Sequence, residues 1–115
     1  MVQVSPGVFE GLVADALDDL PAELAALMDN VAIFVEDESP DEPGLLGVYD
    51  GVPLTERDSS YLLAVPDRIT IFRLPTVAIC GDAAEIRRQV QITVVHEIAH
   101  HFGIDDERLH DLGYA

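Results

Sequence analysis

Apolar positions in the first part of the chain recur with the spacing of a helix. Hydrophobic residues lie three or four positions apart over residues 8–20, which predicts an amphipathic helix. Ser5 can cap this helix, and Pro6 can occupy its first position. Pro21 should break the helical pattern, and residues 22–28 then predict a second short helical segment.

Three later segments have the pattern of strands, because they are rich in β-branched and aromatic residues or alternate between apolar and polar positions. The predicted strands are residues 30–38, 45–49 and 68–73. A loop with two prolines and a glycine, residues 39–44, separates the first two strands. The hydrophobic periodicity fades over residues 52–66, which predicts an irregular segment before the third strand.

The longest periodic stretch lies in the last third of the chain. Asp82 can cap a helix there, and Glu85, three residues later, can complete a capping box. The helical pattern runs without a break to Phe102 and stops at Gly103, a residue suited to a helix C-terminus. Residues 105–112 predict one last short helix. This order of elements predicts an α+β fold, in which a small sheet of three or four strands packs on the long helix and the N-terminal helix.

The length of 115 residues is enough for one compact domain and too short for two, so we expect residues 1–115 to form a single domain. About half of the residues are apolar (49%), which is enough to bury a core.

The charge of the chain is strongly negative, since 22 Asp and Glu residues oppose six Arg residues for a formal net charge of −16. Such a surface repels nucleic acids and anionic membranes, so we expect neither as a partner, whereas cationic partners and metal ions are attracted. The sequence leaves the oligomeric state open.

The targeting features of the sequence predict a cytoplasmic protein. The N-terminus has no basic region followed by an apolar stretch, and no apolar run approaches the roughly 18 to 20 residues that span a bilayer. The single cysteine, Cys80, cannot form an internal disulfide, which fits a reducing compartment. Cys80 precedes His96 by a mostly helical segment on the order of 20 Å long, so we interpret it as a buried thiol rather than a metal ligand.

The long helix contains HEIAH, which begins at His96 and fits the pattern HExxH. His96 and His100 lie one turn apart on one helix face, so both imidazoles can bind a single divalent ion, for which Zn²⁺ is the usual choice. Glu97 projects toward the same space and can take a proton from a metal-bound water, whose pKa zinc lowers to about 7. Gln89 and Thr93 continue the stripe of the two histidines, and we expect this polar stripe to face a cleft.

A catalytic zinc normally has three protein ligands, and the residues after the helix supply candidates for the third. Gly103 can adopt a positive φ and reverse the chain, so that Asp106 points back at the metal. His110 lies one turn after Asp106 and is a second candidate, either as the ligand itself or as a partner of Asp106. Glu107 is a third candidate, with a less favourable direction on the predicted helix.

The stretch from His96 to Asp106 reads HExxHxxGxxD and resembles the metzincin clan of zinc peptidases, in the variant that has aspartate as its third ligand. Over nearly its whole length, the chain is also similar to a small bacterial family of zincin-like metallopeptidases. The matching landmarks are the leading helix and the segments NVAIFVEDE, GVPLTERD, DRITIF and VVHEIAHHFGIDDERLHDLGYA. The resemblance implies a zincin-like fold, with His96, His100 and Asp106 as zinc ligands, Glu97 as general base and a peptide or protein as substrate.

The expected function is therefore the zinc-dependent hydrolysis of peptide bonds through a metal-bound water. By analogy of fold, residues 68–73 would be the edge strand onto which an extended substrate adds. The chain departs from metzincins in two respects. Its methionines, Met1 and Met28, precede the motif, so we expect no methionine turn beneath the metal, and we expect no C-terminal subdomain. These departures leave open a second hypothesis, a catalytically inactive binding module that has kept the zincin scaffold and is stabilised by zinc.

Other polar side chains are interpreted as structural. Thr55, Glu56 and Arg57 lie in the irregular segment, where an ion pair of Arg57 is favoured over a catalytic role. His101 falls on the apolar side of the long helix and is interpreted as a hydrogen-bonded packing residue. Tyr114 can in principle stabilise an oxyanion, but packing is the favoured interpretation.

Overall fold

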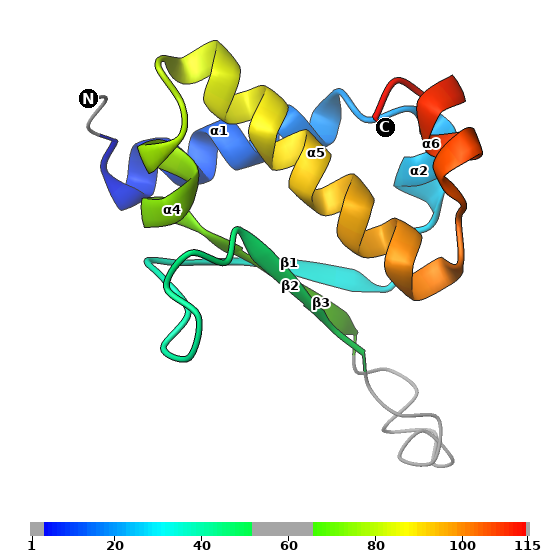
Figure 1. The fold of residues 1–115 in the computed structure, drawn as a ribbon, viewed down its shortest axis with the longest axis horizontal. Coiled ribbons are helices and arrows are strands. Elements are labelled where there is room, and N and C mark those ends of the chain that lie inside the picture. Colours follow the sequence, from blue (N-terminus) through cyan, green and yellow to red (C-terminus); the bar gives the residue numbers. More distant parts are fainter. Residues whose placement is uncertain (1–3, 52–65, 115) are drawn as a thin grey trace.

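The computed structural model describes residues 4–51 and 66–114 of the chain. Within these residues, Figure 1 shows the helices on one side of a small sheet, with the long helix α5 crossing over the strands. The elements follow one another as α1 (Pro6–Asp18), α2 (Ala22–Ala26), β1 (Val31–Glu36), β2 (Gly47–Asp50), β3 (Asp67–Phe72), α4 (Arg73–Ala78), α5 (Ala83–Phe102) and α6 (Asp106–Asp111). The predicted α+β fold is confirmed.

The sheet of the described residues has three strands in the order β1–β3–β2, so β3 lies in the middle. β1 runs parallel to β3, with Ile33 opposite Ile69, and β2 runs antiparallel to β3, with Tyr49 opposite Ile69. Our expectation that residues 68–73 form an edge strand is therefore wrong, because β3 pairs with a strand on each side. In this part of the chain, β2 is the edge strand that packs against α5.

Both long helices begin at the predicted capping residues. The Ser5 hydroxyl oxygen accepts a hydrogen bond from the N–H of Val8 at the start of α1 (3.3 Å). At the start of α5, the Asp82 carboxylate accepts a hydrogen bond from the N–H of Glu85 (2.8 Å), and the Glu85 carboxylate accepts one from the N–H of Gly81 (2.7 Å). These bonds satisfy N–H groups that have no partner inside a helix, so the capping residues determine both starting points.

The end of α5 is also at the predicted residue. Gly103 has a φ of 70°, a left-handed conformation that glycine adopts without the steric cost of a side chain. The N–H of Ile104 then donates to the carbonyl of Ala99 (3.0 Å), which closes the turn. The chain reverses there, and α6 starts after Asp105, whose carboxylate accepts a hydrogen bond from the N–H of Arg108 (2.8 Å).

One helix, α4, was not predicted from the sequence pattern. We expected the third strand to include Arg73, but α4 begins at this residue and follows β3 directly. Pro75 is compatible with the first turn of a helix, where backbone N–H groups have no intrahelical partner. The hydroxyl of Thr76 donates to the carbonyl of Phe72 (2.7 Å), so the change from strand to helix is stabilised locally.

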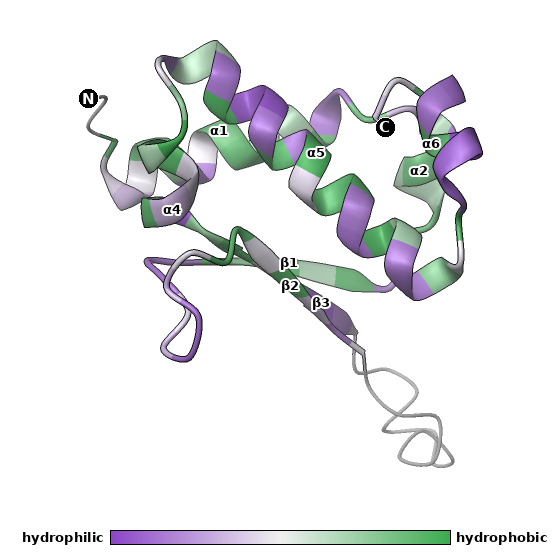
Figure 2. Ribbon diagram, in the orientation of Figure 1, coloured by the Kyte–Doolittle hydropathy of each residue, from purple (hydrophilic) through white to green (hydrophobic). Residues whose placement is uncertain are grey.

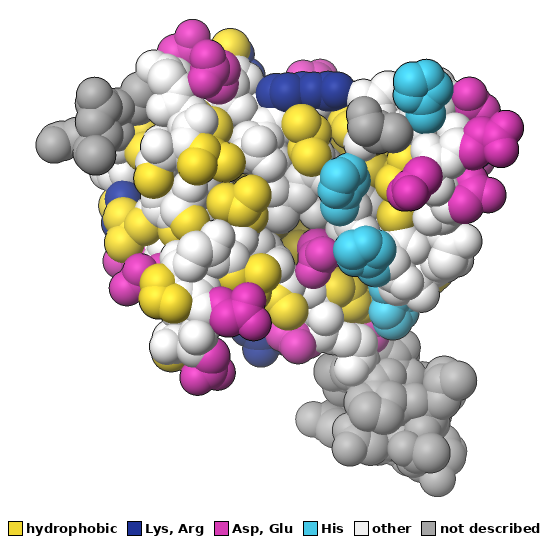
Figure 3. All heavy atoms as spheres, in the orientation of Figure 1, with side chains coloured by type: hydrophobic (Ala, Val, Ile, Leu, Met, Phe, Trp, Pro, Cys, Tyr) yellow, Lys and Arg dark blue, Asp and Glu magenta, His cyan; other side chains and the backbone are white. Residues whose placement is uncertain are grey.

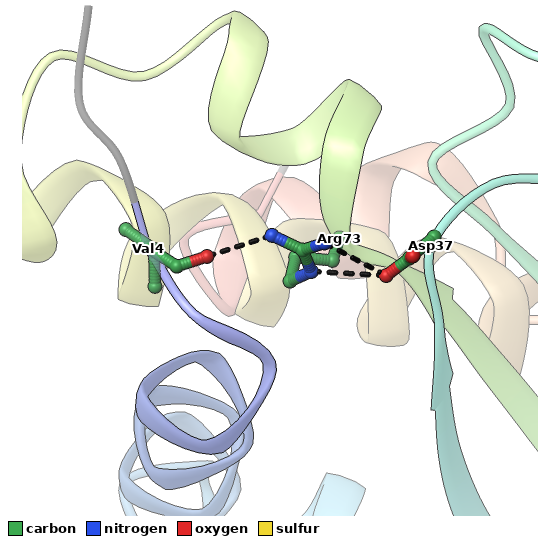
Figure 4. Close-up of polar contacts among 3 residues, drawn as sticks. All are labelled: Val4, Asp37 and Arg73. Carbon is green, nitrogen blue, oxygen red and sulfur yellow. Dashed lines mark hydrogen bonds and ion pairs between the residues drawn. The ribbon is translucent and has the colours of Figure 1, made fainter.

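The side chain of Arg73 connects three parts of the fold at this junction. Its guanidinium donates from Nε and Nη2 to Oδ1 of Asp37 (3.1 and 2.9 Å) and from Nη1 to the carbonyl of Val4 (2.7 Å), as Figure 4 shows. Asp37 directly follows β1, and Val4 lies just before α1. Arg73 therefore links the start of α4 to the sheet and to the N-terminal segment.

The hydrophobic core lies between the helices and the sheet. α1 packs along α5, and α5 packs on β2 and β3. Figure 2 shows many hydrophobic residues in α1 and the strands, whereas α6 and the loop before β2 are mostly hydrophilic. The large hydrophobic side chains that are fully buried are Phe9, Leu24, Ile69, Ile71, Ile86, Val90, Val94, Val95 and Ile98. Because α5 contributes the last five of these, its polar stripe is held at a fixed place in the fold.

Among the described helices, none has the length and apolar character needed to cross a membrane.

Candidate metal centre

A pocket of about 350 Å³ lies between the polar stripe of α5 and the chain that leads into β2. The segment 44–47 forms one wall, and the opposite wall consists of the α5 side chains Gln89, Ile92, Thr93, His96, Glu97 and His100. The stripe thus faces a pocket, as its spacing predicted. Figure 3 shows histidine side chains and carboxylates gathered on one face of the molecule, beside hydrophobic side chains.

Glu97 is held at one of its two carboxylate oxygens. Its Oε1 accepts a hydrogen bond from the backbone N–H of Tyr49 in β2 (3.1 Å). Its Oε2 lies 3.8 Å from Nδ1 of His100. The Glu97 side chain is 22% exposed and that of His100 is 83% exposed, so the carboxylate is partly shielded while the imidazole is open to solvent. An oriented carboxylate that solvent still reaches is suited to transferring protons.

The ring of His96 contacts the last described residue of the chain. Its Nε2 lies 2.8 Å from the carbonyl oxygen of Tyr114. A carbonyl oxygen can only accept a hydrogen bond, so Nε2 carries the proton in this arrangement. Tyr114 is held there by its own N–H, which donates to Leu109 (2.8 Å), and by Arg88, whose guanidinium lies 4.8 Å from the Tyr114 ring centroid. The structure therefore gives His96 a backbone partner that its sequence position did not predict.

The three candidates for a third metal ligand lie on α6. Asp106, Glu107 and His110 are exposed, and none of them lines the pocket of the two histidines. α6 is attached elsewhere, since Arg108 forms an ion pair with Glu23 of α2. Within residues 4–51 and 66–114, no group of three or more His, Cys, Asp or Glu side chains is placed to hold a metal together. The structure brings His96, Glu97 and His100 to one pocket, and the third ligand stays a prediction.

The donors at the pocket fit zinc in their chemistry. Two imidazoles one helical turn apart supply nitrogen ligands, and a carboxylate beside them is available for proton transfer. Histidine ligands usually donate the second ring N–H to a carboxylate, a carbonyl or water, and the Tyr114 carbonyl is such an acceptor. His96 and His100 are therefore the residues that would hold a zinc ion.

Tyr49 is a site residue that the sequence pattern did not reveal. Its ring stacks on His101, with centroids 4.0 Å apart and planes at 16°. Its hydroxyl donates to Oδ2 of Asp67 (2.7 Å), and the Nε2 of His101 lies 3.8 Å from the same atom. His101 packs on an aromatic ring as predicted, but its side chain is 40% exposed, so it does not lie on a buried side of α5. Only the position of Tyr49 on β2, the edge strand that packs against α5, marks it as a site residue.

Cys80 and the Tyr114 side chain do not line the pocket. Cys80 lies before the start of α5 and is only partly buried, so its interpretation as a buried thiol is confirmed in part. Tyr114 is buried, which confirms its predicted packing role, and its carbonyl contacts His96. Thr55, Glu56 and Arg57 lie outside the described residues.

Comparison with known proteins identifies a family. The model of the family described as zincin-like metallopeptidase matches residues 28–114, which include β1, α5 and α6. Among solved structures, a conserved hypothetical protein from Thermo thermophilus is 22% identical, with a TM-score of 0.56 over 86% of this chain and 94% of that chain. This likeness supports the fold. No curated protein matches the sequence.

Proposed function

Because the chain belongs to the family of zincin-like metallopeptidases, we propose that it is a zinc-dependent peptidase that acts in the pocket of His96, Glu97 and His100. The observation that carries this proposal is the pocket itself. One face of α5 presents two imidazoles and a carboxylate to a space that borders the edge strand β2. They supply two of the three protein ligands of a catalytic zinc and a carboxylate for proton transfer.

The ion would be held by His96 and His100, with Asp106 as the proposed third ligand and His110 as its rival. When bound, zinc would make water a better nucleophile and polarise the carbonyl of the peptide bond. The two imidazoles face one pocket, which supports their role as a pair. Asp106 follows Gly103, whose positive φ reverses the chain after α5, and this supports its place in the ligand set.

Glu97 would move the proton in the reaction. As a water oxygen bonds to the carbonyl carbon of the substrate, one water proton passes to the Glu97 carboxylate. The carbon–nitrogen bond then breaks, and Glu97 returns this proton to the amine nitrogen that leaves. The products are a carboxylic acid and an amine, and Glu97 is ionised again. Its partial shielding and its bond to Tyr49 support this role, because they fix the carboxylate next to the pocket.

The substrate would lie along β2 in this proposal, in place of the strand that the sequence suggested. β2 is the edge strand of the described sheet beside α5, and the segment 44–47 lines the pocket. An extended peptide can add to a sheet edge through main-chain hydrogen bonds, which give affinity without dependence on side chains. Gly47 lines the pocket at this edge and lies close against Thr93, so the start of β2 is held beside the helix that carries the motif.

The test is a zinc assay combined with peptide cleavage. We expect one equivalent of zinc by elemental analysis and cleavage of a peptide library, which a chelator abolishes and added zinc restores. A protein that binds one zinc and melts at a lower temperature without it, but cleaves no peptide, would be the zinc-stabilised binding module instead. The contact of His96 with the Tyr114 carbonyl favours this second candidate, because it gives a residue of the HExxH motif a structural contact with the C-terminal segment. A protein that binds no zinc contradicts both functions.

A further inference from the structure

The outer edge of β2 carries a backbone group that the proposed general base already engages. The carbonyl of Leu46 accepts a hydrogen bond from the N–H of Phe72 in β3 (2.9 Å), so the backbone of Leu46 points into the sheet. Backbone groups of successive strand residues point to alternate sides, and Tyr49 therefore presents its N–H at the outer edge. There this N–H donates to Oε1 of Glu97 (3.1 Å). The edge strand thus holds one oxygen of the carboxylate.

The Tyr49 side chain attaches this strand to the helix turn that follows Glu97. Its ring stacks at 4.0 Å on His101, which lies four residues after Glu97 on α5. The Tyr49 hydroxyl donates to Asp67 at the start of β3 (2.7 Å), so the ring is fixed at its far end as well. Phe102 packs edge-on against both rings, with centroid distances of 6.3 Å and 4.9 Å. The position of the Tyr49 N–H is therefore set by contacts on the helix and on the sheet.

A second contact fixes β2 to the helix turn that precedes Glu97. Gly47 lies so close to α5 that a Cβ atom there would be 2.6 Å from Cγ2 of Thr93. Thr93 lies four residues before Glu97 and is buried. The strand thus approaches α5 closely one turn before Glu97 and stacks on it one turn after. These two contacts, one on each side of Glu97, fix the distance between the Tyr49 N–H and Oε1 of Glu97.

We propose that Tyr49 is a positioning residue for the general base, an inference that rests on the proposed function. Its N–H fixes Oε1 of Glu97, so that Oε2, on the side of His100, is the oxygen that takes the proton from water and returns it to the leaving amine. The stack of Tyr49 on His101 keeps the N–H in place. Small displacements of a reacting group can reduce the rate by on the order of 100-fold, so a fixed carboxylate is of direct catalytic value.

The first test measures hydrogen exchange and needs no activity. We expect the Tyr49 amide to be protected in the wild-type protein and to exchange about 10-fold or more faster in Glu97→Ala, which removes the acceptor. Glu97→Gln keeps an oxygen acceptor at the same reach, so it should restore most of the protection. Equal exchange rates in the wild type and Glu97→Ala would overturn the proposal, whether or not the protein cleaves peptides.

The second test measures kcat and KM per zinc-loaded molecule. We expect Tyr49→Ala to lower kcat by on the order of 10-fold while KM changes little, and Tyr49→Phe, which keeps the ring stack, to recover much of the loss. His101→Ala should have a similar effect, and the double variant should lose little more, because both residues act through one stack. Phe34→Ala is the matched control, since it also removes an aromatic ring from a strand; the Phe34 ring lies 4.3 Å from the Arg68 guanidinium and outside the pocket.

The two tests separate the failure of this inference from the failure of the proposed function. Additive losses in the double variant, or an equal loss in Phe34→Ala, would show a general effect on folding and would overturn the positioning role of Tyr49. An inactive wild-type protein would instead contradict the proposed function. In that case the exchange of the Tyr49 amide would still decide whether β2 holds Glu97.

Discussion

The Nε2 atom of His96 lies 2.8 Å from the carbonyl oxygen of Tyr114. This contact joins the first histidine of the motif to a residue that follows α6, the helix that carries every candidate for the third ligand. Since the carbonyl can only accept, the neutral ring has its proton on Nε2 and its lone pair on Nδ1. The state of the His96 ring is therefore coupled to the position of α6.

This coupling predicts that zinc changes the C-terminal segment. Asp106 and His110 do not line the pocket of the histidines, so bringing either one to the ion must move α6 and the Tyr114 that follows it. We expect the ¹⁵N spectrum of the zinc-free protein to show the His96 tautomer protonated at Nε2. Saturating zinc should then shift the NMR signal of the Tyr114 amide, while the signal of the Val13 amide in α1 stays in place. An unchanged Tyr114 amide on zinc binding would contradict a ligand on α6.

The identity of the third ligand is tested by comparing two alanine variants. We predict that Asp106→Ala nearly abolishes zinc binding, whereas His110→Ala weakens it by at most about 10- to 100-fold, the range for a residue that only supports a ligand. His96→Ala and His100→Ala are the positive controls, and each should empty the site. Zinc affinity is measured by competition with a chelator of known strength. If His110→Ala empties the site and Asp106→Ala does not, the assignment based on the spacing from Gly103 is wrong.

The close approach of β2 to α5 predicts a strong effect of one methyl group. Gly47→Ala would place its Cβ 2.6 Å from Cγ2 of Thr93 and 3.1 Å from the Thr70 carbonyl oxygen. We expect a loss of about 1 to 3 kcal/mol in the free energy of unfolding, as for other overpacked sites. Thr93→Ser removes the opposing methyl and should reduce the cost of Gly47→Ala in the double variant. The free energy is measured by urea unfolding.

Gly44→Ala is the matched control for this close contact. A Cβ at Gly44 meets nothing within 4 Å, although the residue lines the same pocket. Its substitution should change the free energy of unfolding by no more than about 0.5 kcal/mol. Equal losses at Gly44 and Gly47 would mean that the close approach of β2 to α5 does not limit stability.

The features that the sequence predicted correctly are set by local interactions. The ends of α5 follow from Asp82 and Gly103, because capping and a left-handed glycine act within one turn of the helix. The polar stripe of Gln89, Thr93 and His96 follows from the helical period alone, and the structure places it at a pocket. Both inferences require no knowledge of the rest of the fold.

The features that the sequence did not predict depend on contacts between distant segments. Analogy of fold placed residues 68–73 at the edge of the sheet, but the position of β3 between β1 and β2 is decided by strand pairing, which local pattern does not encode. The bond of Glu97 to Tyr49 and the contact of His96 with Tyr114 involve backbone atoms, which every residue type carries. The residue types at positions 49 and 114 therefore give no sign of these two contacts.

Cys80 gives a prediction for chemical reactivity and pH. Burial raises the pKa of its thiol, and the negative charges of Glu85 and Asp82 raise the pKa further. The folded protein therefore has less thiolate near the ordinary pKa of cysteine, so iodoacetamide should react more slowly with the folded chain than with the chain in urea. Because the pKa is higher in the folded state, the thiol's contribution to stability is present below its ordinary pKa and is lost as the pH rises through the folded-state pKa. An equal or faster reaction in the folded protein would contradict this environment.

The role of Glu97 as the general base of a zinc peptidase is tested by Glu97→Gln. The measurement is the cleavage of a peptide library by protein whose zinc content has been determined by elemental analysis. Glu10→Gln is the matched control, since Glu10 lies in α1 outside the pocket of the histidines. We expect Glu97→Gln to keep one equivalent of zinc and to lose cleavage by on the order of 100-fold or more, while Glu10→Gln cleaves as the wild type does. Zinc-loaded Glu97→Gln that cleaves peptides at the wild-type rate would contradict this role.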